Sequence, residues 1–139
     1  MRATRALVAH AQAALSRILR FDAPADQLLS RYFRDHRNLG QNDRAFVAET
    51  VFAILRRKRS LEAAARSSEP AALVAAALEP VVAEEFPPAV RADMPDWLWQ
   101  RLVQQYGEDE AQRLAQGLLN PAPLDLRVNL ARIDRDAAR

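Results

Sequence analysis

The chain has 139 residues, half of them hydrophobic and 27% charged, with a formal net charge of +2. This apolar content excludes disorder over the whole length, and the absence of cysteine excludes disulfides, thiolate metal sites and thiol nucleophiles. No apolar run approaches the roughly 18 residues that cross a membrane. Arg17 and Arg20 interrupt what would be the apolar region of a signal peptide, so we expect a cytoplasmic protein.

Charge is distributed unevenly along the chain. Residues 1–68 hold thirteen Lys or Arg against six Asp or Glu, a net charge of +7, and residues 69–139 hold seven against twelve, a net charge of −5. Nineteen of the twenty basic residues are Arg, whose planar guanidinium suits bidentate phosphate contacts. The basic half therefore favours an RNA or DNA partner. The alternative is that a GC-rich genome simply encodes Arg.

The abundance of Ala and Leu, with only three Gly, favours an all-α fold. The first predicted helix spans residues 3–20 and is amphipathic, because its apolar positions recur at helical spacing. Its apolar face consists of Leu7, Ala11, Ala14, Leu15, Ile18 and Leu19, and its basic face of Arg2, Arg5, His10, Arg17 and Arg20.

A second helix is predicted from Pro24 to about Asp35, followed by a loop with Gly40 as its pivot. The third is predicted over residues 42–59, with Asn42 or Asp43 as its N-cap. It is apolar almost all round, which is typical of a buried central helix. The expected apolar face of the second helix is Leu28, Leu29, Tyr32 and Phe33.

The remaining chain is punctuated by Pro80, Pro87, Pro88 and Pro95. Residues 122–129 lead into a predicted short strand, and a charged segment follows, so we expect the front module of something longer. Further helices are predicted over residues 61–67, 71–78, 95–106 and 108–119.

Basic residues of the first and third helices are the candidates for RNA contact. Asp43 would cap the third helix and orient Arg44, and the cluster after Arg56 would meet phosphates, although cations are favourable at any helix C-terminus. Arg56 itself is expected to be partly buried and structural, since it shares a narrow polar strip with Glu49. The predicted RNA-contact residues are Arg2, Arg5, Arg17, Arg20, Arg44, Arg57, Lys58 and Arg59.

Other chemistry-bearing residues lack partners in the sequence. His10 and His36 stand alone, without ligand spacing. Trp97 and Trp99 face different sides of a predicted helix, so we expect one in the core and the other against a neighbouring module. With no zinc pattern, phosphate-cradling loop or nucleophile elbow, the sequence predicts no catalytic, cofactor-binding or metal-binding residue.

Two long segments resemble known proteins. Residues 28–62, LLSRYFRDHRNLGQNDRAFVAETVFAILRRKRSLE, are similar to the first helices of the NusB-like RNA-binding fold. Residues 94–138 look like the stretch that joins this fold to the catalytic half of bacterial small-subunit rRNA cytosine-C5 methyltransferases of the RsmB/Sun (Fmu) group. Pro-x-Trp-Leu, Tyr-Gly-x-x-x-Ala and Pro-Leu-Asp-Leu-Arg-Val-Asn occur in the expected order.

The resemblance implies a NusB-like RNA-binding helical domain over residues 1–90, a helical linker over 91–121, and the start of a truncated RRM-like methyltransferase region over 122–139. In that family a catalytic domain binds S-adenosylmethionine and uses two cysteines. This chain has no cysteine, so no catalytic residue is carried over. Residues 67–91 depart from the pattern, because they are short and interrupted by proline where the family has a second helical bundle.

Three functions follow as hypotheses. The first is an RNA-binding module of an rRNA (cytosine-C5) methyltransferase that positions small-subunit rRNA, with the missing catalytic domain as a partner and S-adenosylmethionine as the cofactor of the parent enzyme. The second is a NusB-like protein-interaction module acting in transcription antitermination. The third is a scaffold that docks on the catalytic domain without touching RNA, through the surface near Trp97 or Trp99.

Overall fold

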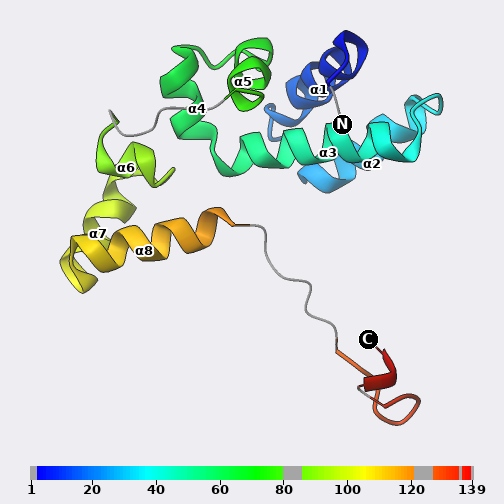
Figure 1. Ribbon diagram of the computed structural model, residues 1–139. Helices are drawn as coiled ribbons and strands as arrows, with labels where there is room; N and C mark the ends of the chain where they lie inside the picture. Colours follow the sequence, from blue (N-terminus) through cyan, green and yellow to red (C-terminus); the bar gives the residue numbers. More distant parts are fainter. Residues whose placement is uncertain (1–2, 80–85, 121–126, 135, 139) are drawn as a thin grey trace.

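The computed structural model describes residues 3–79, 86–120, 127–134 and 136–138, and this part of the chain is all-helical, as predicted (Figure 1). Its elements are α1 (Arg5–Ile18), α2 (Ala25–Asp35), α3 (Gln41–Arg56), α4 (Lys58–Ala65), α5 (Pro70–Ala77), α6 (Pro88–Arg91), α7 (Asp96–Tyr106), α8 (Glu108–Leu119) and a 3₁₀ turn, η1 (Asp136–Ala138).

Helix α1 forms where the sequence predicts it. The hydroxyl of Thr4 accepts a hydrogen bond from the Leu7 amide at 3.3 Å, which satisfies one of the orphan N–H groups of the first turn. The apolar stripe is confirmed, because every member except the half-buried Leu19 is buried. Helix α1 packs against α2, α3 and α5, so its stripe lies at the centre of the bundle.

Helix α3 starts earlier than predicted and ends earlier. Gly40 takes the N-cap position, and the carboxylate of Asp43 accepts a hydrogen bond from the Gly40 amide at 3.0 Å, so the predicted cap at Asn42 or Asp43 is wrong. The helix stops at Arg57, whose backbone lies at φ −120° and ψ 31°, and α4 begins at Lys58. This bend lets Leu61 return to the core, where it is buried.

Helices α1–α5 share one hydrophobic core. Because α3 contributes several of its fully buried side chains, its prediction as a buried central helix is confirmed. Burial of one such apolar side chain stabilises the folded protein by about 1.5–3 kcal/mol, because apolar surface is removed from water. The core consists of Ala11, Ala14, Leu15, Ile18, Leu29, Tyr32, Leu39, Val47, Val51, Ile54, Leu61, Leu73 and Val74.

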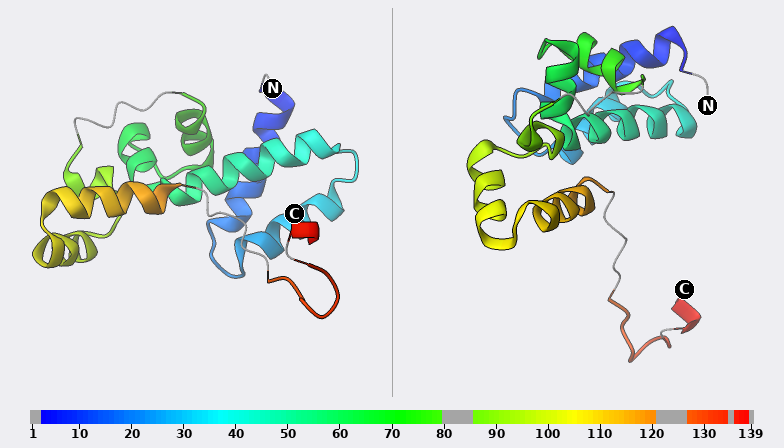
Figure 2. Two further views of the ribbon diagram at one scale, coloured as in Figure 1. Left: turned by 60° about the horizontal axis from the view of Figure 1, so that its bottom comes forward. Right: turned by 60° about the vertical axis from the view of Figure 1, so that its left-hand side comes forward.

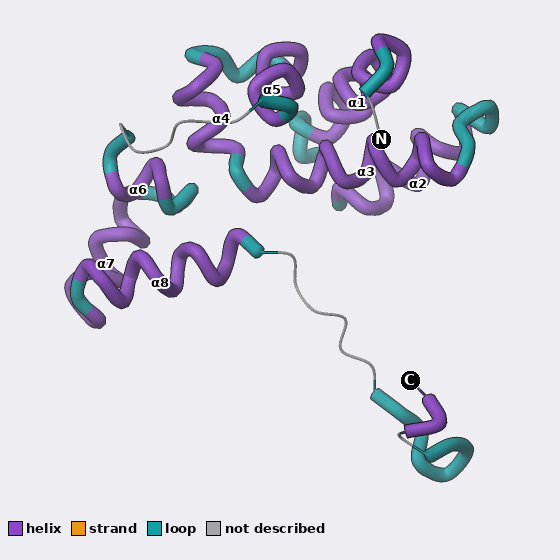
Figure 3. The backbone as a smooth tube through the Cα atoms, viewed as in Figure 1, coloured by secondary structure: helices purple, strands orange, loops and turns teal. Residues whose placement is uncertain are grey.

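Helices α6–α8 are built around a second, smaller core. Helices α7 and α8 pack side by side as a hairpin, and Gly107 between them has φ +81°, a conformation that favours glycine. The two views in Figure 2 and the tube in Figure 3 show this arm extending from the α4 end of the bundle. The second core consists of Ala89, Ala92, Met94, Trp99, Ala111 and Ala115.

The predicted short strand, into which residues 122–129 lead, is not seen in the described part of the C-terminal segment. Residues 121–126 lie outside the described residues, and residues 127–134 have no regular secondary structure. A strand is held by hydrogen bonds to a neighbouring strand, and the described residues contain no such neighbour. Among the helices that the structure describes, none has the length and apolar character needed to cross a membrane.

Candidate nucleic-acid interface

The predicted RNA-contact residues of α1 and the chain around it are exposed. Arg5 lies on the surface at the start of α1, while Arg2 lies outside the described residues. Arg17 is bonded to Asp35 on α2, with Nη1 and Oδ2 at 3.3 Å, and its guanidinium lies 5.3 Å from the centre of the Tyr32 ring. Arg20 pairs with Asp22 at 3.5 Å. Both pairs are solvent-exposed and therefore weak, so these guanidinium groups remain able to meet a phosphate.

The Arg44 side chain is held by contacts within the bundle. Its Nε donates a hydrogen bond to the Leu39 carbonyl at 2.9 Å, and its guanidinium lies 5.9 Å from the centre of the Phe33 ring. The half-buried side chain thus ties the start of α3 to the loop that follows α2. This contact gives Arg44 a structural role whether or not it meets a ligand.

The basic cluster at residues 56–59 is not a single patch. Lys58 forms an ion pair with Glu62 one turn later in α4. Arg59 donates to the Met94 carbonyl oxygen and to the Asp96 carboxylate, and so contacts the α6–α8 arm. Arg57 is exposed. Arg56, the last residue of α3, is also exposed, so the predicted partly buried role of this residue is wrong.

Sequence reasoning missed three exposed arginines. Arg31 and Arg34 lie on the polar face of α2, and Arg37 lies in the loop after it. None of the three forms an ion pair with any described residue. The exposure of Arg31 and Arg34 could have been predicted from the sequence, because positions 31 and 34 fall opposite the apolar positions 29 and 32 of this helix.

Two groups of exposed arginines lie in different parts of the bundle. Arg5 begins α1, Arg31 and Arg34 lie on α2, and Arg37 follows in the turn before α3, which lies at the end of the bundle away from the α6–α8 arm (Figure 1). The junction of α3 with α4 lies at the opposite end, next to the α6–α8 arm. We name the first group the arginine end: Arg5, Arg31, Arg34 and Arg37.

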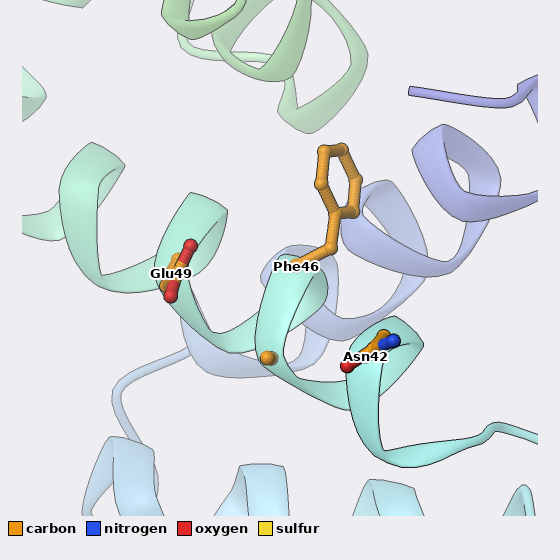
Figure 4. Close-up of a pocket in the computed structure, with 4 residues that line it drawn as sticks. Asn42, Phe46 and Glu49 are labelled. Carbon is orange, nitrogen blue, oxygen red and sulfur yellow. The ribbon is translucent and has the colours of Figure 1, made fainter. Parts of the chain in front are cut away.

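A shallow groove of about 520 Å³ lies on α3 and is lined by Asn42, Ala45, Phe46 and Glu49. Figure 4 shows the side chains of Asn42 and Glu49 along the same helix, with the Phe46 ring directed away toward the neighbouring helices. One carboxylate and one amide provide neither a paired acid and base nor a ligand set. Among the described residues, no group of three or more His, Cys, Asp or Glu could hold a metal ion.

His10 and His36, predicted to stand alone, are brought together by the fold. Their rings meet edge to face with centroids 5.2 Å apart, and both contact Tyr32. The prediction that they are isolated is therefore wrong, because helix packing places α1 beside the end of α2. Their hydrogen bonds are made to Tyr32, which gives them a structural role in this interface.

One of the two tryptophans lies in a core, as predicted: Trp99 is 8% exposed in the second core. Trp97 is 63% exposed, and its contact with a neighbouring module stays a prediction. A further apolar surface lies along α7 and α8 as a groove of about 480 Å³. We name it the arm groove; it is lined by Leu102, Tyr106, Glu110, Arg113, Leu114, Gly117 and Leu118.

Comparison with protein families places part of the chain in a known domain family. Residues 94–139 match the family described as "Methyltr_RsmF/B-like, ferredoxin-like domain". Comparison with curated proteins and with solved structures gives no match. The matched residues include α7, α8 and the arm groove, whereas the NusB-like likeness of residues 28–62 and the narrower Sun (Fmu) assignment stay predictions. The match shows that residues 94–139 are similar to this domain.

Proposed function

We propose that this chain is the RNA-binding N-terminal module of an S-adenosylmethionine-dependent rRNA (cytosine-C5) methyltransferase and that it positions small-subunit rRNA for the catalytic half. The observation that carries the proposal is the arginine end, a set of exposed arginines without described ion-pair partners on a bundle whose chain continues into the segment that matches the methyltransferase family.

The proposed chemistry is electrostatic positioning. Guanidinium groups contact phosphate oxygens in a planar, bidentate way and release counterions from the RNA, which gives affinity without base specificity. Arg31 and Arg34 lie one helical turn apart on α2, so they follow one line along the surface. Such an array fixes the orientation of a backbone and leaves the choice of nucleotide to the catalytic half.

S-adenosylmethionine is proposed for the parent enzyme and not for these residues. A doubly wound methyltransferase domain would hold the cofactor at a glycine-containing turn after a strand. Here Gly40 and Gly107 stand at helix starts, Gly117 lies within α8, and the described residues contain no strand. These residues do not fit the cofactor, so no step of the reaction is assigned to them.

The experiment is fluorescence-anisotropy titration of a small-subunit rRNA fragment at several salt concentrations. The test variant replaces Arg31, Arg34 and Arg37 with Gln, and the matched control removes the same charge from exposed positions elsewhere, Arg101, Arg127 and Arg132. With about 0.7 counterions released per single-stranded phosphate contact, loss of three contacts should reduce the slope of log K against log salt by about 2.

Equal weakening by the two triple variants would show that only net charge matters and would contradict the proposal. Absence of binding at low salt would do the same. Lys58 and Arg59 are left unchanged, because both hold structural contacts and their removal would confuse loss of RNA binding with loss of fold.

The arm groove favours a second candidate function, a scaffold that docks on the catalytic half of the enzyme. Tyr106, Leu114 and Leu118 are exposed there, and Leu118 is 70% exposed. These residues lie in the segment that matches a ferredoxin-like domain, an architecture in which helices pack on a β-sheet. The proposed partner surface is therefore the apolar face of a sheet.

Calorimetric titration against the isolated catalytic half of an RsmB/RsmF-type methyltransferase tests this candidate. Replacing Leu114 and Leu118 with Gln should weaken association at least about tenfold, since each loses a buried apolar contact. The control replaces Leu78 and Leu130, which are exposed outside the groove. Equal affinity of both double variants would contradict docking through the arm groove.

A further inference from the structure

The N-terminus of α4 lacks a cap of its own. The N-cap position is occupied by Arg57, whose side chain makes no capping hydrogen bond. A helix start leaves backbone N–H groups without intrahelical partners, and a buried start needs acceptors for them. Ser60, the third residue of α4, is buried, so water does not readily supply the acceptor for its amide.

Asp93, in the turn that follows α6, supplies the missing acceptor. Its Oδ1 accepts a hydrogen bond from the Ser60 amide at 2.8 Å, and its Oδ2 accepts one from the Ser60 hydroxyl, also at 2.8 Å. The carboxylate thus sits at the positive end of the α4 dipole, where a negative charge is favourable. Asp93 occupies the position relative to α4 that a Ser or Asp N-cap would fill within a single helix.

The backbone of Asp93 adopts the left-handed conformation that ends helix α6. Helix α6 ends in a Schellman motif, in which the Met94 amide bonds to the Ala89 carbonyl at 3.1 Å and the Asp93 amide bonds to the Val90 carbonyl at 3.0 Å. Asp93 therefore has φ +51°, a left-handed conformation for which glycine is the ordinary choice. Aspartate is one of the few other residues that adopt this conformation readily, and here the conformation places its carboxylate at the start of α4.

Arg59 makes a second connection beside the first. Its Nη1 donates to the Met94 carbonyl, and its Nη2 donates to the Asp96 carboxylate at 2.7 Å. Asp96 is the first residue of α7, so α4 is bonded to the end of α6 and to the start of α7. The two hydrophobic cores share no member, and the hydrogen bonds described between the bundle and the arm are those made by Ser60 and Arg59, beside the packing of α4 on α6.

We propose that Asp93, Ser60 and Arg59 form a latch that holds the α6–α8 arm in one orientation on the bundle. When the latch is broken, both cores stay folded and the arm changes its orientation relative to the bundle as a unit. The latch thereby fixes the direction in which the segment matched by the methyltransferase family leaves the bundle. The proposed latch is independent of RNA binding and is tested by separate experiments.

The first readout is hydrogen exchange at the Ser60 amide. In Asp93→Gly the backbone keeps a residue suited to positive φ, so any loss of protection comes from the missing carboxylate. Exchange at Ser60 should become about tenfold faster in Asp93→Gly, the size expected for loss of a helix cap, and Asp93→Asn, which keeps one acceptor oxygen, should lie between. Asp109→Asn, an exposed aspartate at the start of α8, is the matched control.

The second readout is the distance between arm and bundle. Because the chain has no cysteine, Ser30→Cys on α2 and Gln116→Cys on α8, both exposed, give two unique spin-label positions. The distance distribution should be narrow with Asp93 present, broad in Asp93→Gly and in Arg59→Gln, and narrow in the control, with the helical circular dichroism unchanged throughout.

Unchanged Ser60 exchange in Asp93→Gly would overturn the capping role. A narrow, unshifted distance distribution in both Asp93→Gly and Arg59→Gln would overturn the latch. RNA affinity of the bundle should not change in Asp93→Gly, so failure of the RNA titration and failure of the latch are separate results.

Discussion

The Tyr32 hydroxyl lies 2.7 Å from Nδ1 of His10 and joins α2 to α1 through a side-chain hydrogen bond. Tyr32 also stacks on His36, with ring centroids 4.1 Å apart, and its carbonyl accepts a hydrogen bond from His36 Nδ1 at 2.8 Å. One tyrosine therefore links the first helix, the second helix and the turn that ends it.

Removal of the Tyr32 hydroxyl should destabilise the bundle. Tyr32→Phe keeps the buried ring but leaves His10 without its partner, and we expect the free energy of unfolding to fall by about 1 kcal/mol. Urea unfolding followed by circular dichroism measures the change. Tyr106→Phe, at an exposed position on α7, is the control and should be neutral; equal effects of the two variants would contradict the assigned role.

The same residue should make stability fall in alkaline solution. Burial raises the pKa of Tyr32 above its ordinary value of 10.0, and the charge of Arg17 lowers it only in part. Because the unfolded chain then loses the proton first, the stabilisation is complete below pH 10.0 and is lost as the pH rises through the folded value. Absorbance titration of tyrosinate in the Tyr106→Phe background isolates Tyr32, and titration at the ordinary value would refute this prediction.

Protonation of Glu62 should make the stability of the protein fall in acidic solution. Partial burial raises the pKa of this carboxyl, but hydrogen bonds from Lys58 and Ser68 and the charge of Lys58 outweigh it, and the pKa lies below its ordinary value of 4.5. The stabilisation is therefore present above pH 4.5 and is lost as the pH falls through the folded value. Glu62→Gln should lower stability by about 0.3–0.5 kcal/mol at neutral pH, and the difference from the parent chain should vanish in acid.

The two tryptophans should differ in accessibility to a fluorescence quencher. Trp97→Phe leaves only the buried Trp99, whose emission should be blue-shifted and weakly quenched by acrylamide. Trp99→Phe leaves the exposed Trp97, which should be quenched strongly, and should also lower the stability of the arm. Similar quenching in the two variants would contradict the packing of α7.

The central helix should be intolerant of truncation. Ile54 is fully buried in α3, so Ile54→Ala should lower the free energy of unfolding by about 2–5 kcal/mol, whereas Ile54→Val should cost about 0.5–1.5 kcal/mol. Glu49→Ala, on the exposed side of the same helix, is the control and should change stability little. A much smaller decrease in the free energy of unfolding of Ile54→Ala would mean that neighbouring side chains move in to fill the space left by the missing atoms.

Much of the fold follows from local patterns in the sequence. The buried face of α1 was predictable because apolar residues recur at helical spacing, and the burial of α3 because Val47, Val51 and Ile54 leave only a narrow polar strip. The break between α7 and α8 at Gly107 was also predictable, since glycine adopts a positive φ more readily than other residues. The same patterns placed Arg31 and Arg34 on an exposed face, although the predicted contact list did not include them.

What the sequence by itself determined is which segments become helices, which faces they bury and that the basic residues gather in the first half. Only the tertiary structure decided which of those charges are committed to the fold: Arg59 to Met94 and Asp96, Lys58 to Glu62, and Arg44 to the loop after α2. It also placed Asp93 over the start of α4. The physical reason is that helix formation depends on residues three or four apart, whereas an acceptor for Ser60 or Arg59 comes from more than thirty residues away and exists only once the two cores have packed.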